Sequence, residues 1–181
     1  MQNYTQKTIN ETIELQGIGL HNGVKVNLVV KPADPNTGII FKRVDLDDDN
    51  IIKAKYDNVI EPVLCTKLKN SDGISVSTIE HLMAAFLGVG LDNAIVELDS
   101  QEVPILDGSA KDFINIIKET GLKSSDVPIK LVKINNFIEF VDGDKYISID
   151  KSNTTLEIEY EVNFENQLIK SQKNKVNVFE D

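Results

Sequence analysis

The chain has 181 residues, of which 41% are hydrophobic and 27% are charged. This composition is ordinary for a globular protein, so it excludes an intrinsically disordered chain and a fibrous repeat. The 19 basic and 29 acidic residues give a formal net charge of −10. Because that charge repels phosphate backbones and anionic lipid headgroups, we expect neither a nucleic acid nor a membrane surface as a partner.

Cysteine content and the N-terminal sequence bear on the cellular compartment. Cys65 is the one cysteine of the chain, so no internal disulfide can form, which fits the reducing cytoplasm. The N-terminus lacks the basic start and apolar run of a signal peptide, and no stretch reaches the roughly 18 apolar residues of a membrane span. We therefore expect a cytoplasmic protein without a membrane span.

The region before the first predicted helix is rich in strands. Ile9, Ile13 and Leu15 share one parity, which predicts a half-buried strand over 7–15. A glycine-rich turn follows at 17–23, because glycine and asparagine adopt backbone angles that other residues avoid. Further strands are predicted at 24–30, 38–45, 51–60, 63–69 and 74–77. The pattern predicts an antiparallel sheet.

Two later segments have helical spacing. The first carries an apolar stripe with spacings of three and four: Ile79, Leu82, Met83, Phe86 and Leu87. Ser77 and Glu80 have the spacing of a capping box, so a helix is predicted over 77–88. A strand at 93–99 precedes the second helix, which is predicted over 109–120 and ends at Gly121.

A second domain is predicted after a polar stretch at 121–128, which we interpret as a linker. The expected domains are therefore 1–124 and 125–181. Strands are predicted at 131–134, 137–141, 146–149 and 156–164. Strict alternation gives this second sheet an apolar face that needs cover, yet only a polar tail follows at 173–181. The sequence predicts an α+β protein with an incomplete second domain.

The first predicted helix carries two neighbouring polar residues, Glu80 and His81. The side opposite its apolar stripe gathers His81 with Ala84, Ala85 and Gly88, and such small residues predict a helix packed on both sides. The positive end of a helix favours an ionised carboxylate and a neutral imidazole, the forms of a general base and a metal ligand. Spacing alone nevertheless favours structural roles, because Glu80 fits a cap and lone histidines are usually hydrogen-bonding residues.

A complete metal site does not follow from spacing. A catalytic zinc site needs three protein ligands, and HExxH spacing is absent. His21 and Cys65 are the other strong nitrogen and sulfur candidates, but no CxxC or HxH pair places them. Cys65 is interpreted as a small buried apolar residue. The position of His21 in the glycine turn leaves open whether it stabilises the turn or belongs to a site.

Several strings in one order carry a family resemblance. They are G-I-G-L-H-N-G at 17–23, L-C-T at 64–66, S-T-I-E-H-L-M-A-A at 77–85, D-N at 92–93 and E-V-P-I-L-D-G-S-A at 102–110. With D-G-D-K at 142–145, they make essentially the whole chain resemble the UDP-3-O-acyl-N-acetylglucosamine deacetylase family. Each string is weak by itself, but the third and the fifth together in one chain are very specific.

The resemblance implies a function and a fold. Members of the family are cytoplasmic Zn²⁺ hydrolases that remove the N-acetyl group of UDP-3-O-acyl-N-acetylglucosamine, the committed step of lipid A synthesis. The implied fold is two α+β domains, each a sheet with helices on one face, that pack helix to helix, and the complete protein is expected to be a monomer. His81 is similar to the zinc ligand of the first domain, and Glu80 to the general base that deprotonates a zinc-bound water.

The resemblance also implies roles for residues around this pair. Leu64, Cys65 and Thr66 are similar to the segment that borders the substrate. Phe164 is similar to an aromatic position that contacts the uracil ring. His21 and Asp107 match positions that we interpret as shaping or supporting the loops of the site rather than as ligands.

Two motifs of the family are missing from this chain. The other zinc ligands lie in an H-K-x-x-D motif, and a threonine after an A-R-T-F segment helps hold the oxyanion, but neither motif is present and the chain has two histidines. We therefore expect a C-terminally truncated deacetylase with negligible turnover by itself. The alternatives are a non-catalytic binding module that grips a partner through the small-residue face of the first helix, or one part of a split or fused deacetylase.

Overall fold

The chain divides into two compact units, Met1–Ile129 and Lys130–Asp181. The computed structural model describes residues 4–48, 50–60, 63–152 and 156–178. Sheets and two α-helices make up the regular structure of these residues, apart from one short 3₁₀ helix. The prediction of an α+β fold is thus confirmed.

A five-stranded sheet of order β2-β3-β9-β4-β5 forms the base of the first unit. Its strands are β2 (Ile13–Ile18), β3 (Lys25–Pro32), β4 (Ile39–Arg43), β5 (Ile51–Lys53) and β9 (Ala94–Leu98). Neighbouring strands are antiparallel, except that β4 and β9 are parallel. Val26, Leu28 and Val30 alternate with more exposed residues along β3, so one face of the sheet is apolar.

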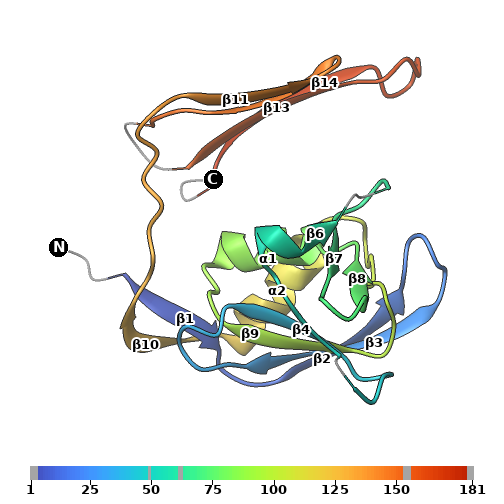
Figure 1. The fold of residues 1–181 in the computed structure, drawn as a ribbon, viewed down its shortest axis with the longest axis vertical. Coiled ribbons are helices and arrows are strands. Elements are labelled where there is room, and N and C mark those ends of the chain that lie inside the picture. The colour runs from blue at the N-terminus through green and yellow to red at the C-terminus, as the bar shows by residue number, and fades with distance from the viewer. Residues whose placement is uncertain (1–3, 49, 61–62, 153–155, 179–181) are drawn as a thin grey trace. The chain divides into compact units, whose positions relative to one another are not determined.

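Two helices cover this apolar face, as Figure 1 shows: α1 (Glu80–Val89) and α2 (Lys111–Thr120), which lie side by side. Phe86 of α1 and Phe113 and Ile117 of α2 are almost completely buried against Phe41, Leu28 and other strand residues. Both helices begin a few residues later than the sequence predicts. The buried side chains of both helices fix α1 over the sheet. The first turn of α1 lies at the edge of the core.

The buried arc of α1 differs from the predicted stripe. Ala85 is fully buried, whereas Leu87 is 49% exposed. These two residues stand about 100° to either side of Phe86 around the helix, so the core lies on the Ala85 side. The prediction that Leu87 belongs to the buried stripe is therefore wrong, and Ala85, which the sequence placed on the opposite side of the helix, lies in the core. The outward face carries the exposed Ala84, Leu87 and Gly88, where the sequence predicted packing on both sides of the helix.

A pair of strands at the edge of the first unit corrects the linker predicted at 121–128 and the single strand predicted over 7–15. β1 (Thr5–Ile9) pairs antiparallel with β10 (Leu122–Pro128), with Ile9 opposite Leu122. The stretch 121–128 is thus a strand rather than a linker, because its backbone bonds to β1 although its side chains are mostly polar. The first unit extends to Ile129, beyond the boundary expected at 124. The strand predicted over 7–15 is two strands, β1 and β2.

A small three-stranded sheet precedes α1 in the chain. This sheet positions the loop before its middle strand next to the start of α1. It contains β6 (Val59–Ile60), β7 (Lys67–Lys69) and β8 (Ser75–Ser77), after the 3₁₀ helix η1 (Tyr56–Asn58). Leu68 and Val76 are directly opposite each other and buried. Because β7 and β8 are adjacent, the residues just before β7 lie beside the residues just after β8, where α1 begins.

The second unit contains two hairpins: β11 (Ile138–Asp142) with β12 (Lys145–Ile149), and β13 (Glu157–Asn163) with β14 (Ser171–Asn177). Phe140, Ile147 and Tyr160 are among its exposed apolar side chains. The strand predicted at 131–134 does not form, and Leu131 and Val132 are highly exposed there. Without a neighbouring strand to bond its backbone, this apolar run stays irregular.

The second strand of the last hairpin, β14, corrects the expected polar tail at 173–181, of which 179–181 lie outside the described residues. Lys173 of β14 contacts Glu159 of β13 at 2.7 Å, and Lys175 contacts Glu157 at 3.4 Å. Opposite charges across an antiparallel pair stabilise it without an apolar stripe. A strand of this kind has no period-two apolar pattern, so the sequence did not indicate it.

Gly19, in the glycine turn, is predicted to be intolerant of any side chain. An added Cβ would lie 2.6 Å from Glu102 Oε2 and would also contact Asn22 Oδ1, and hydrogen bonds hold both oxygens in place. Gly19→Ala should therefore destabilise the fold by about 3 kcal/mol. Urea unfolding followed by circular dichroism measures this loss.

The matched control for this change is Gly23→Ala. Gly23 has φ +65° but has no atom within 4 Å of an added Cβ. We expect only the backbone penalty, about 1–2 kcal/mol. Equal losses for the two variants would show that crowding around the Glu102 carboxylate does not restrict Gly19.

Candidate functional site

The corner between β8 and α1 carries the two polar residues that the sequence singles out. β8 ends at Ser77, Thr78 has φ +56°, and Glu80 is the first residue of α1. The predicted capping box is wrong: Ile79 precedes the helix without a side-chain cap, and the Ser77 hydroxyl donates to the Gln101 carbonyl at 3.2 Å. Ser77 lies too far back in strand β8 to cap the helix.

Glu80 is hydrogen-bonded to the loop before β7. The Thr66 backbone N–H donates to Glu80 Oε2 at 3.0 Å, and the Ile79 N–H lies 3.5 Å from the Thr66 carbonyl. Thr66 is thus held to the start of α1 at both its donor and its acceptor. Among the described residues, the other carboxylate oxygen of Glu80 has no hydrogen bond, so it can accept a proton from a bound molecule.

The residues before Thr66 are more exposed than it is. Leu64 is 88% exposed and has φ +59°, an unusual backbone conformation for leucine. Cys65 is a half-buried free thiol, so the interpretation of a buried apolar residue is corrected. The short strand β7 starts after Thr66, so residues 64–65 form an open loop that presents its apolar side chain to solvent. The structure thus brings Thr66 to the start of α1, and Leu64 and Cys65 directly precede Thr66 in the chain.

His81 is half-buried in the first turn of α1, directly after Glu80. Within the described parts of the chain, no group of three or more His, Cys, Asp or Glu side chains could hold a metal ion. Three protein ligands are the usual minimum of a catalytic zinc site. The described side chains therefore do not by themselves fit such a site, and His21 and Cys65 do not complete one around His81.

Glu102 is the residue of this region that sequence reasoning missed. It is 1% exposed, and its carboxylate accepts from the His21 N–H at 2.9 Å, the Asn22 N–H at 2.9 Å and the Thr78 hydroxyl at 2.8 Å. Burial alone would raise the pKa of Glu102, but these hydrogen bonds outweigh it and hold the pKa below its ordinary value. Its partners are distant in sequence, so spacing gave no signal; the apolar V-P-I directly after this acid was the one hint.

His21 and Asp107 lie in the loops that surround this network. The backbone N–H of His21 bonds to Glu102, while its side chain is exposed. Asp107 accepts from the Ser109 N–H at 2.9 Å and from the Ser109 hydroxyl, and these bonds hold the pKa of Asp107 below its ordinary value. The Ser109 hydroxyl in turn accepts from the Lys111 N–H at the start of α2. Asp107 therefore shapes the turn that leads into α2.

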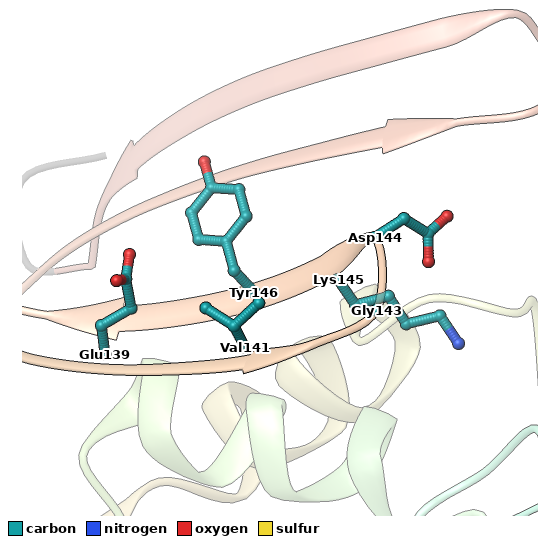
Figure 2. Close-up of a pocket in the computed structure, with 6 residues that line it drawn as sticks. All are labelled: Glu139, Val141, Gly143, Asp144, Lys145 and Tyr146. Carbon is teal, nitrogen blue, oxygen red and sulfur yellow. The ribbon is translucent and has the colours of Figure 1, made fainter.

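The remaining predicted residue, Phe164, follows β13 in the second unit and is 51% exposed. A hollow of about 240 Å³ lies in the same unit, on the β11–β12 hairpin. Figure 2 shows that its lining residues Glu139, Val141 and Tyr146 point to one side of the hairpin. A hollow of about 520 Å³ in the first unit lies against β1 and β10. Neither hollow is lined by a predicted site residue, so we place the candidate site at the start of α1.

Within the described ranges, no helix has both the length and the apolar character needed to cross a membrane.

Comparisons with known proteins agree on one family. The family model described as UDP-3-O-acyl N-acetylglycosamine deacetylase matches residues 6–181. A protein of Pseudoalteromonas atlantica named UDP-3-O-acyl-N-acetylglucosamine deacetylase is 41% identical over 164 residues, which are 91% of this chain and 54% of the relative. Proteins of the same name from Shewanella violacea and Vibrio campbellii are 43% and 38% identical over 91% and 94% of this chain. The chain spans about half the length of these relatives.

Proposed function

The chain belongs to the UDP-3-O-acyl N-acetylglycosamine deacetylase family, and from this premise we propose that it supplies Glu80 and His81 to a deacetylase. The proposed reaction is hydrolysis of the N-acetyl group of UDP-3-O-acyl-N-acetylglucosamine, which releases acetate and a free amine, in lipid A synthesis. The relatives' names and the matched family model support the substrate. In keeping with the family, we propose that the whole protein acts in the cytoplasm as a monomer.

The observation that carries the proposal is the hydrogen bond from the Thr66 N–H to Glu80 Oε2. It fixes one carboxylate oxygen and leaves the other to act as a proton acceptor, the role that amide hydrolysis requires of a general base.

Zn²⁺ is the cofactor that we propose for the whole protein, with His81 as one of its ligands. Since the described side chains do not fit a complete zinc site, the remaining ligands have to come from residues outside this set. Glu80 and His81 are consecutive, and their side chains differ in direction by about 100° around the helix. A general base and a metal ligand from this chain can therefore reach the same bound group.

For the substrate we propose three contacts from the loop before β7 and one from the second unit. The exposed Leu64 offers an apolar surface to the substrate. Cys65 and Thr66 lie between Leu64 and Glu80, to which the Thr66 N–H is bonded. Phe164 is exposed and can stack on the uracil ring. His21 and Asp107 support the loops, through the backbone bond to Glu102 and through the turn before α2.

A chimera tests the proposed function. Residues 1–181 are joined to the part of the Pseudoalteromonas atlantica relative that the chain does not match, and acetate release from UDP-3-O-acyl-N-acetylglucosamine is measured with Zn²⁺. We expect the chimera to release acetate, a chelator to stop the release and added Zn²⁺ to restore it. The 181-residue chain with the same Zn²⁺ should release none, because its described residues lack a three-ligand group.

The intact relative and the circular dichroism spectrum of the chimera are the controls. A folded but inactive chimera beside an active relative would contradict the deacetylase proposal and favour the non-catalytic binding module. Acetate release by the 181-residue chain alone would contradict the proposal that ligands outside the described residues are required.

A further inference from the structure

The buried carboxylate of Glu102 joins three segments that are far apart in the sequence. Its donors are the backbone of His21 and Asn22 in the glycine turn and the hydroxyl of Thr78 after β8. All three partners donate hydrogen bonds, and an ionised carboxylate only accepts them, so each partner meets a suitable acceptor. Such charge-assisted bonds are among the stronger hydrogen bonds in proteins.

Backbone hydrogen bonds place Glu102 beside the end of β8. The Ser77 N–H donates to the Gln101 carbonyl at 2.9 Å, and the Val103 N–H donates to the Ser77 carbonyl at 3.1 Å. These two bonds bracket Glu102 and set its side chain against the next residue of the chain, Thr78. The Glu102 carboxylate is therefore fixed from its own backbone as well as by its partners.

Thr78 makes the turn from β8 toward α1. It is 2% exposed and has φ +56°, a conformation that costs a β-branched residue free energy. Its hydroxyl bond to Glu102 Oε1 at 2.8 Å offsets that cost. Glu80 follows two residues later, so the backbone direction at Thr78 sets where the Glu80 side chain begins.

We propose that Glu102 is a positioning residue for Glu80: through the Thr78 hydroxyl, its carboxylate holds the β8–α1 corner in the conformation in which Glu80 accepts the Thr66 N–H. The hydrogen bonds from Thr78 to Glu102 and from Thr66 to Glu80 define this geometry. Its consequence for catalysis rests on the proposed function.

The Thr66 amide is the probe, because its N–H bonds to Glu80 and its exchange with solvent reports that bond. In the ¹⁵N-labelled 181-residue chain, Thr78→Val keeps the side-chain shape and removes the hydroxyl donor. We expect the Thr66 amide to exchange about tenfold faster, the change that loss of a charge-assisted bond produces. Thr78→Ser, which keeps the hydroxyl, should restore slow exchange.

Glu102→Gln should have the same effect, because its NH₂ group would face backbone donors. Glu97→Gln is the matched control: Glu97 lies on β9 and pairs with Lys31 at 2.6 Å, away from the corner, so Thr66 exchange should not change. Unchanged amide signals along β3 and β9 establish that a variant is folded. If Glu102→Gln does not fold, Thr78→Val decides the test.

Unchanged Thr66 exchange in folded Thr78→Val overturns the inference, and so does failure of Thr78→Ser to restore it. In the chimera, Thr78→Val should lower kcat about tenfold with little change in KM, since it displaces the base rather than the substrate contacts. An inactive parent chimera would contradict the proposed function, while the exchange result would still decide the positioning role.

Discussion

Glu80→Gln is expected to lower the kcat of the chimera for deacetylation by about 10²–10⁴-fold, because an amide cannot accept the proton that a carboxylate takes. Glutamine has the same length, and its carbonyl oxygen can still accept the Thr66 N–H that bonds to Glu80 Oε2. The local fold and the substrate contacts of Leu64, Cys65 and Thr66 should persist. KM should therefore stay close to that of the parent.

The control for this prediction is Glu119→Gln, the same change at an exposed residue near the end of α2. It should leave both kcat and KM unchanged. A Glu80→Gln chimera that keeps more than about a tenth of the parent kcat would exclude Glu80 as the general base. The structural roles that spacing favours for Glu80 and His81 would then be the better interpretation.

Local patterns were sufficient for most of the first unit. The period of two along β3 and the spacing of Leu82 and Phe86 in α1 both correspond to buried side chains. These patterns work because a strand or a helix buries one side against a single core. They are less reliable at the edge of the buried arc. Ala85 and Leu87 are the two neighbours of Phe86, yet Ala85 is buried and Leu87 is exposed.

Elements that depend on a distant partner were missed. β10 is polar and forms because β1, at the other end of the unit, bonds its backbone. β14 forms because β13 bonds its backbone, with ion pairs such as Lys173 with Glu159 across the two strands. In both strands, the stabilising groups are backbone or charge, and neither leaves an apolar period in the sequence.

In the candidate site too, the sequence identified some residues, whereas contacts between distant residues were visible only in the fold. Glu80 and His81 could be named from the sequence, although their roles came from a family resemblance rather than from spacing. The bond between Thr66 and Glu80 and the network around Glu102 join residues 14 to 81 positions apart, so only the fold reveals them. Glu102 matters because it is buried among donors, a property that no single-sequence pattern encodes.

Phe86→Ala is expected to destabilise the first unit by about 3–5 kcal/mol, because it removes a ring that is 1% exposed and leaves a cavity between α1 and the sheet. The same helix offers a control one residue further on: Leu87 is 49% exposed, so Leu87→Ala should cost less than about 1 kcal/mol. Urea unfolding of the 181-residue chain, followed by circular dichroism at a helix wavelength, measures both. The described helices all belong to the first unit, so the signal reports that unit.

The sequence stripe and the structure make different predictions for this pair. The stripe treats Phe86 and Leu87 as equal members of the core and so predicts two large losses. Burial on the Ala85 side of α1 predicts a large loss of stability for Phe86→Ala and a small loss for Leu87→Ala. A loss of several kcal/mol for Leu87→Ala would mean that the exposed face of α1 is covered in solution, as the sequence first predicted for a helix packed on both sides. A small loss leaves Ala84, Leu87 and Gly88 as an open surface beside the candidate site.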